Sequence, residues 1–440
     1  MKKMLMITAV AAMTAFSVQA QGSEELAALQ KQLNTLSAKI AQLEKANAEK
    51  TAQVEQTAQI ENANAAKIAQ LEQSNADQMA QIKKDSDAKA WSIEQLQAEG
   101  KKDEASAWAN DIKIKGDLRA RYEKRDSKKS TGATNDKDRE RIRLRVGAYG
   151  KVNDQTDFGV RLATGGSTAS RTSSNVDMGD SGSPKSIYLD QAYIDYHPDR
   201  LPGTHMFVGK MPQPWMAADS GLLWDSDLNP EGVAVTYEKQ FVPFKLMANA
   251  GTFIFQDNLS DDTVLWSGQV AVEKAVGNGK LTLGISDYCF ANSFSTTTNL
   301  TSGPNANTVG TGFNMIEGFG SYVFTVAKMP VKINGQYVVN VDATGSDDTA
   351  YLAGITIGKA KEVGTWEVGY SYRDIGNDAT VAGLNDSDFA GETWTGCYGH
   401  RFNGKYQVMK NMSADLAYIL STDWKGQNAN TFQADLNFKF

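Results

Sequence analysis

From about residue 111 to the end of the chain, hydrophobic and polar residues alternate one by one. The final segment, NTFQADLNFKF at 430–440, predicts a strand whose two faces differ. One face carries only apolar side chains: Phe432, Ala434, Leu436, Phe438 and Phe440. The apolar face therefore continues to the last residue, which is aromatic.

The same period predicts about sixteen strands, joined alternately by short connections and by longer segments that are mostly rich in Ser, Thr, Asp, Asn and Gly. Antiparallel barrels of the outer-membrane type show this alternation of short turns and long loops. The predicted strands begin near residues 111, 138, 156, 187, 204, 231, 243, 263, 279, 314, 329, 348, 364, 398, 412 and 430.

Two architectures share this period. A soluble sandwich turns its apolar faces inward, whereas an outer-membrane barrel turns them to lipid and its polar faces to a wet lumen. Arg141, Arg143 and Arg145 share one predicted face, which suits a lumen, and aromatic residues cap many apolar faces, as interfacial girdles require. We therefore expect an all-β transmembrane barrel of about sixteen antiparallel strands, whose last strand pairs with the first because open edges are costly in lipid.

The N-terminus predicts export from the cytoplasm. Lys2 and Lys3 precede an apolar segment, and Val18-Gln19-Ala20 fits a small-x-Ala cleavage site. Residues 1–20 are therefore expected to be a signal peptide. Residues 21–100 and 101–440 are expected to be a coiled coil and the barrel.

The coiled-coil prediction rests on two repeats in a segment, 24–99, without Pro or Gly. Leucine and isoleucine recur at steps of three and four over 26–43, and three eleven-residue units follow over 58–90. A lone solvated helix is the other interpretation. The recurring apolar positions form a stripe, here called the seam. Because large apolar residues are few in it, the seam is better explained if several chains share it.

Composition narrows the chemistry. The net charge of −7 does not indicate a nucleic-acid partner. Two cysteines are too few for a disulfide framework or a metal cluster, and with three histidines we do not expect a histidine-ligated metal site. We see no catalytic constellation, so we expect neither an enzyme nor a bound cofactor. Whether Cys289 and Cys397 pair is left open.

Several motifs resemble a known family. A C-terminal strand that ends in Phe resembles the assembly signal of Gram-negative outer-membrane proteins, here Phe432, Leu436, Phe438 and Phe440. The segments LDQAYIDYHPD (189–199), VGKMPQPW (208–215) and DSDLNPEGVAVTYE (225–238) resemble the putative porin family, which pairs a coiled coil with a barrel. The resemblance covers roughly residues 24–440 and implies a homotrimer in the outer membrane, with the coiled coil in the periplasm.

Residues 212–230 join the fifth and sixth predicted strands, a place similar to that of the inward-folded constriction loop of general porins. Trp215, Leu222, Leu223 and Trp224 are expected to pack this segment against the inner wall. The acids expected at the lumen are Asp219, Asp225 and Asp227, with Glu231 at the next strand.

A basic ladder is expected across the pore: Arg119, Arg121, Arg141, Arg143 and Arg145. The neck is the level of the lumen where this loop would face the ladder. Acidic side chains that face basic side chains across a narrow neck would select solutes by charge and polarity. The other interpretation is that these arginines pair with Asp117, Glu123 and Glu140 of the same hairpin and only solvate the wall.

These features lead to two functional hypotheses. The first is a porin through which small hydrophilic solutes or ions diffuse passively. The second is a structural anchor in outer-membrane lipid, whose coiled coil tethers the membrane to the cell wall or spaces it from the wall. The solute and its charge preference do not follow from the sequence.

Overall fold

The computed structural model describes residues 30–45, 64, 66–84, 111–128, 134, 136–165, 170–217, 221–257, 261–292, 307–389 and 395–440. The chain divides into two units, residues 1–103 and 104–440. The expected signal peptide lies outside the described residues.

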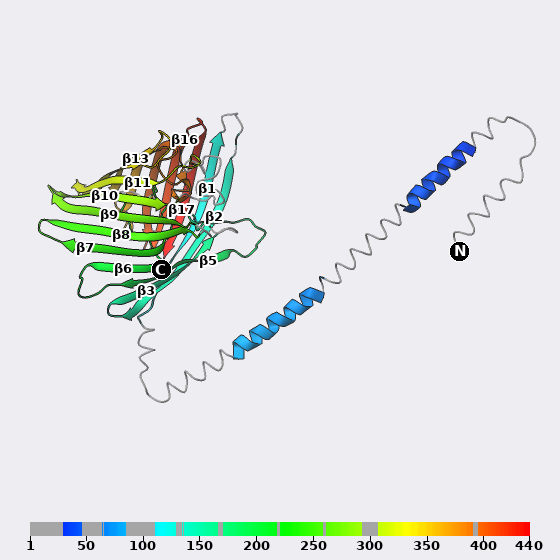
Figure 1. The fold of residues 1–440 in the computed structure, drawn as a ribbon, viewed down its shortest axis with the longest axis horizontal. Coiled ribbons are helices and arrows are strands. Elements are labelled where there is room, and N and C mark those ends of the chain that lie inside the picture. The colour runs from blue at the N-terminus through cyan, green and yellow to red at the C-terminus, as the bar shows by residue number, and fades with distance from the viewer. Residues whose placement is uncertain are drawn as a thin grey trace, which may run out of the picture. The chain divides into compact units, whose positions relative to one another are not determined.

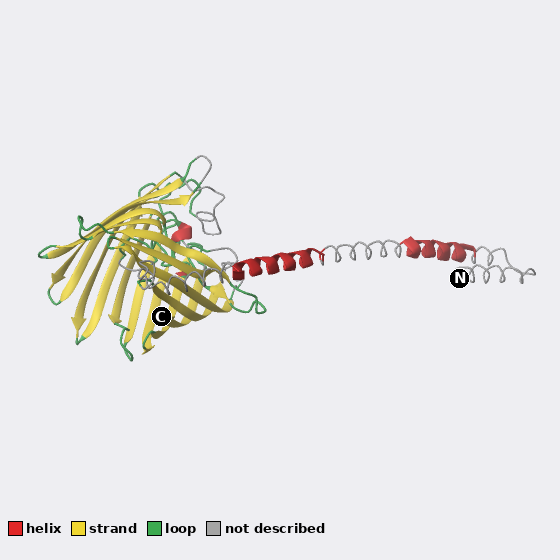
Figure 2. Cartoon of the chain, turned by 90° about the horizontal axis from the view of Figure 1, so that it is seen from below, coloured by secondary structure: helices red, strands yellow, loops and turns green. Residues whose placement is uncertain are grey.

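In the first unit, the described residues form helix at 30–45 and 66–84 (Figure 2). The seam residues Leu33 and Leu36 are 60% and 61% exposed in this single chain. An association of several helices remains a prediction. Among the described residues, no helix is long and apolar enough to cross a membrane.

The second unit is one antiparallel sheet that closes on itself, because β17 pairs with β1 over twelve residue pairs, from Asp117↔Lys439 to Lys128↔Asn428 (Figure 1). Sixteen long strands form the wall, and each begins within two residues of its predicted start. The strands are β1 (Lys113–Lys128), β2 (Lys137–Asn153), β3 (Thr156–Gly165), β5 (Ser186–Tyr196), β6 (Thr204–Lys210), β7 (Glu231–Gln240), β8 (Phe244–Gln256), β9 (Thr263–Val276), β10 (Gly279–Ala291), β11 (Asn314–Val326), β12 (Met329–Asn340), β13 (Thr349–Gly358), β14 (Trp366–Ile375), β15 (Cys397–Met409), β16 (Met412–Asp423) and β17 (Asn428–Lys439).

Two short elements were not predicted. β4 (Val176–Asp177) lies in the loop between β3 and β5 and pairs with Arg141 and Ile142 of β2. The 3-10 helix η1 (Ala382–Leu384) lies in the loop between β14 and β15. Both are too short to leave a periodic signal in the sequence.

The two ends of the barrel differ. One end, here called the turn end, carries the connections 154–155, 197–203, 241–243, 277–278, 327–328, 359–365 and 410–411. The opposite loop end carries 129–136, 166–185, 211–230, 257–262, 292–313, 341–348, 376–396 and 424–427. The last connection, 424–427, is a tight turn, in which the Asp423 carboxylate accepts the backbone N–H groups of Lys425 and Gln427 at 2.9 and 2.8 Å.

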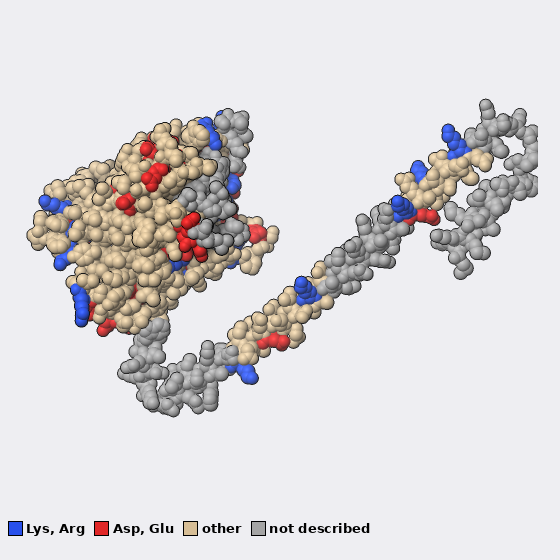
Figure 3. Space-filling model, viewed as in Figure 1, with Lys and Arg blue, Asp and Glu red and all other residues tan. Residues whose placement is uncertain are grey.

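The two faces of the wall are inverted relative to a soluble protein. In β1, Leu118 and Tyr122 are 40% and 39% exposed, whereas Arg121 and Glu123 on the other face are 6% and 0% exposed. The outer wall shows a broad surface without Lys, Arg, Asp or Glu in Figure 3. Apolar side chains outside and buried polar side chains inside are what lipid and an enclosed lumen require.

The chain end completes this wall. Phe440 and Gly116 exchange backbone hydrogen bonds of 2.9 and 3.0 Å, and the Phe440 ring lies over Gly116, where a Cβ would collide with it. The assembly-signal residues Phe432, Leu436, Phe438 and Phe440 are all outward and 37–57% exposed. Phe440 therefore covers the junction of β1 and β17, where the barrel closes.

Candidate functional site: the neck of the lumen

The loop 211–230 folds into the barrel, as expected. Trp215, Leu222, Leu223 and Trp224 are at most 8% exposed and belong to one apolar cluster inside the wall. The two indoles stack at 4.6 Å between ring centroids, and the Trp215 ring meets Phe253 of β8 edge-on at 5.2 Å. The predicted packing of this loop against the inner wall is confirmed.

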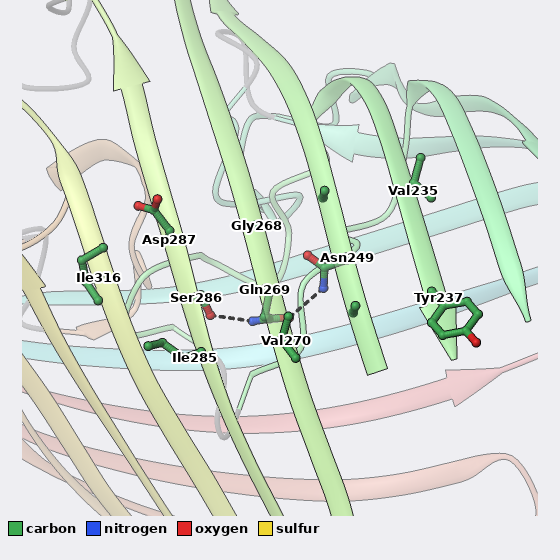
Figure 4. Close-up of a pocket in the computed structure, with 12 residues that line it drawn as sticks. Val235, Tyr237, Asn249, Gly268, Gln269, Val270, Ile285, Ser286, Asp287 and Ile316 are labelled. Atoms are coloured by element: carbon green, nitrogen blue, oxygen red, sulfur yellow. Dashed lines mark hydrogen bonds between the residues drawn. The ribbon is translucent and has the colours of Figure 1, made fainter. Parts of the chain in front are cut away.

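Polar contacts fix the position of the same loop. The Trp215 Nε1–H donates to Ser267 Oγ at 3.1 Å. The Gln269 side chain accepts the Met216 N–H at 2.7 Å and donates to the Met216 carbonyl at 2.8 Å. In Figure 4, Gln269 also lies between Asn249 and Ser286, to which it is hydrogen-bonded. The loop is therefore attached to the wall by both the oxygen and the nitrogen of the Gln269 side-chain amide.

The loop 376–389 also folds inward, which the sequence analysis missed. Val381, Leu384 and Phe389 are at most 2% exposed and join the same cluster. The Asp225 N–H donates to the Leu384 carbonyl at 2.7 Å, so the two inward loops are hydrogen-bonded to each other. The available signal was the apolar run ATVAGL at 379–384 within an Asp- and Asn-rich segment.

Asp225 lies between the two loops rather than at an open lumen surface. Its carboxylate is 6% exposed and accepts the N–H groups of Asp227 and Ser387 at 2.8 and 3.0 Å. Burial, together with the carboxylates of Asp386 and Asp227, raises the pKa of Asp225 to about 8. This acid therefore joins the loops instead of facing a solute.

The other expected acids occupy three different situations. Asp227 lies 3.3 Å from Arg145 and 3.6 Å from Arg143, in direct contact with the ladder. Glu231 is on the outward face with Val233, is 63% exposed and pairs with Lys210 at 2.7 Å, so the structure does not bring it to the neck. Strand alternation explains this, because residue 231 has the outward parity of β7. Asp219 lies outside the described residues.

The ladder arginines are largely covered, with side chains 5–19% exposed. The hairpin acids account for part of this: Asp117 binds Arg143 and Arg145 at 2.9 and 2.8 Å, and Glu123 lies 3.6 Å from Arg141. Glu140, by contrast, is exposed on the outer face of β2. The interpretation in which the hairpin pairs internally therefore applies to two of its three acids.

Arg121 is covered by one acid of a loop and one acid of a strand. Arg121 binds Asp388 of the second loop at 2.8 Å and Asp435 of β17 at 2.7 Å. Burial opposes the charge on Asp388, but the guanidinium of Arg121 outweighs it and lowers the pKa of that carboxyl well below its usual range. On the neighbouring part of the wall, Arg373 of β14 and Arg401 of β15 both hold Asp386 at 3.1 Å. The ladder is thus the surface on which the inward loops rest.

Two further features are the pair of cysteines and a groove on the outer wall. No disulfide joins Cys289 to Cys397. A groove of about 500 Å³ lies on the lipid-facing side, floored by Ala250 and Gly268 and bordered by Asp287 (Figure 4). It is separated from the neck by the wall itself.

The comparisons with known proteins bear on this barrel and its filled neck. The sequence model of a family described as putative porin matches residues 126–311 and 320–440. The chain belongs to the putative porin family. No curated protein sequence matches the chain.

Two solved structures to which the chain is similar are distant from it in sequence. OprB of Pseudomonas putida is 11% identical over 76% of this chain and 96% of that chain, with a TM-score of 0.50. The outer membrane channel DcaP of Acinetobacter baumannii is 14% identical over 75% and 97% of the two chains, with a TM-score of 0.45. At such identities, the likeness to OprB shows the barrel fold alone.

For a porin barrel, the narrowest level of the lumen decides which solutes pass. Inside this barrel, two loops lie against the arginines of the ladder. Sequence reasoning identified one loop and all five arginines, but it missed the second loop with Asp386 and Asp388.

Proposed function

We propose that this protein is an outer-membrane porin through which small hydrophilic solutes or ions diffuse passively. The observation that carries this proposal is the closed sixteen-strand wall with an apolar outer face and charged inner face. Lipid requires the first face and an aqueous path requires the second. Membership of the putative porin family supports the same function.

The finer proposal places the coiled coil in the periplasm and the barrel in a homotrimer. The exposed leucines of the described helices support association, because no apolar side chain in the described part of the chain covers them. We further propose that selectivity is set at the neck, where Asp227 and Asp388 meet Arg145 and Arg121. These pairs neutralise much of the positive charge of the ladder. The polarity and size of a solute therefore affect its passage there more than its net charge does.

A second candidate function is a structural anchor. The observation that favours it is the inward folding of two loops at the loop end, where the ladder side chains are at most 19% exposed. A barrel closed at this level would pass nothing and would serve to hold the N-terminal segment at the membrane, against the cell wall. No module that recognises the cell wall is identified in the chain.

One experiment separates the two functions. The refolded full-length protein is inserted into a planar bilayer, and single-channel conductance and reversal potential are measured under a salt gradient. Ohmic steps, especially in groups of three, support an open trimeric porin, and the sign of the reversal potential gives its charge preference. Stable insertion without conductance refutes the porin proposal and favours the anchor.

A further inference from the structure

Two of the three histidines lie together on the lumen side of the turn end. His197 directly follows β5 and His205 is in β6, and their ring centroids are 5.5 Å apart. His205 stacks on Phe207 at 6.1 Å, and Phe207 packs against the interior cluster, whereas its neighbour Val208 is outward and 54% exposed. The histidine pair therefore borders the mouth of the lumen.

A carboxylate lies against one nitrogen of each ring. The Asp195 oxygens are 2.9 and 3.0 Å from His205 Nδ1, and an Asp157 oxygen is 3.6 Å from His197 Nε2. Histidines that bind metals usually donate their second nitrogen to a carboxylate, which fixes the tautomer and orients the ring. The Asp195–His205 contact is short enough for such a hydrogen bond, whereas the Asp157–His197 contact is a longer ion-pair distance. The opposite nitrogens, His205 Nε2 and His197 Nδ1, make no hydrogen bond within the described part of the chain.

The distance between the rings suits one shared ion. A Zn–N bond of about 2.1 Å places the ion about 3.2 Å from the centroid of a ligating imidazole, so two imidazoles at a tetrahedral angle have centroids about 5.2 Å apart. The observed 5.5 Å is close to this value. The His205 side chain is 46% exposed, so an ion has access to it from the mouth.

We propose that His197 and His205 form a transit site for a divalent ion of the Zn²⁺, Ni²⁺ or Cu²⁺ class at the turn-end mouth of the lumen. Imidazole suits these ions, whereas Mg²⁺ and Ca²⁺ prefer oxygen ligands. Asp195 orients His205 and is not itself a ligand.

The site has two protein ligands and not more. Among the described residues, no group of three or more His, Cys, Asp or Glu is arranged to hold a metal ion. Water completes the coordination, so the ion binds weakly and exchanges. Weak binding is compatible with conduction, because an ion that binds too tightly does not leave. The contrasting interpretation is that each histidine merely pairs with its aspartate at the barrel rim.

Calorimetric titration of ZnCl₂ into the refolded full-length protein tests the site directly. The wild type and the control His400→Gln are expected to bind one ion per chain with equal affinity, because His400 is outward on β15 and bonded to Tyr370. His197→Gln and His205→Gln are each expected to weaken binding, and Asp195→Asn to weaken it about tenfold. Each variant is first checked for the heat-modifiable gel mobility of a folded barrel. Unchanged affinity in both histidine variants, or equal affinity for MgCl₂, would overturn the inference.

A conductance measurement then tests transit, and only this part rests on the proposed porin function. Zn²⁺ added on the turn-end side is expected to lower wild-type conductance reversibly, with recovery on adding EDTA, and to leave the histidine variants unaffected. If the protein binds Zn²⁺ through the pair but conducts nothing, the porin proposal fails and the site stands. If it conducts and the variants bind Zn²⁺ like the wild type, the site is refuted and the porin stands.

Discussion

Trp215 offers the sharpest test of the filled neck. Replacing Trp215 with Ala removes the ring that stacks on Trp224 and the N–H that bonds Ser267, while leaving every strand residue in place. The side chain is 8% exposed, so docking of the loop removes about 200 Å² of it from water. At about 25 cal/mol per Å² this amounts to about 5 kcal/mol, and allowing for residual contacts of the free loop leaves about 4 kcal/mol.

A loss of about 4 kcal/mol shifts the equilibrium between docked and undocked loop about a thousandfold. We therefore expect Trp215→Ala to show larger or noisier single-channel steps in a planar bilayer, with an unchanged folded barrel. Trp266→Ala is the matched control, because Trp266 is on the lipid-facing side of β9 and 58% exposed. If Trp215→Ala and Trp266→Ala both conduct like the wild type, the loop does not limit the passage and the reasoning is refuted.

Three further predictions follow from the wall and the loops. Leu144→Arg, on the outer face of β2, is expected to cost about 2–4 kcal/mol of folding free energy in lipid vesicles if it meets lipid near the midplane; a cost no larger than that of Leu144→Met would contradict the assignment of the faces. Gly116→Ala is expected to impair closure, because its Cβ would collide with the Phe440 ring and come within 2.5 Å of the Arg145 carbonyl oxygen, whereas Gly318→Ala, which meets nothing within 4 Å, is expected to fold normally; gel mobility of the folded barrel distinguishes them. Because the docked loops raise the pKa of Asp225 from 3.8 to about 8, the docked state binds more protons between about pH 4 and pH 8, so docking weakens as pH rises through that range; conductance is expected to increase from pH 5 to pH 8 in the wild type and to change less in Asp225→Asn.

The wall of this barrel could be predicted because its signal is local. Side chains on a strand alternate between faces with a period of two, so the sequence around Leu144 or Phe438 already shows which residues share a face. The starts of the strands followed from the same pattern and from the turn residues between them. Even closure of the barrel followed, because an open edge is unstable in lipid.

The neck could be predicted only in part. The loop 211–230 was recognisable from its tryptophans and its place between strands, whereas the loop 376–389 has small apolar residues among many polar ones. Glu231 was placed at the lumen by its position beside the loop, although its strand parity turns it outward. The sequence positions of acids near a loop do not show which of their side chains face the lumen.

The sequence by itself determined the starts of the strands and their inverted faces, since these depend on residues close together in the chain. It also predicted closure, because an open edge is unstable in lipid. Only the tertiary structure decided that two loops meet inside the barrel and that their acids Asp227 and Asp388 contact the arginine ladder. The pair Arg121–Asp388 joins residues 267 positions apart, and its members become neighbours only after β17 has closed on β1. Such contacts depend on the diameter of the closed wall, which no local pattern records.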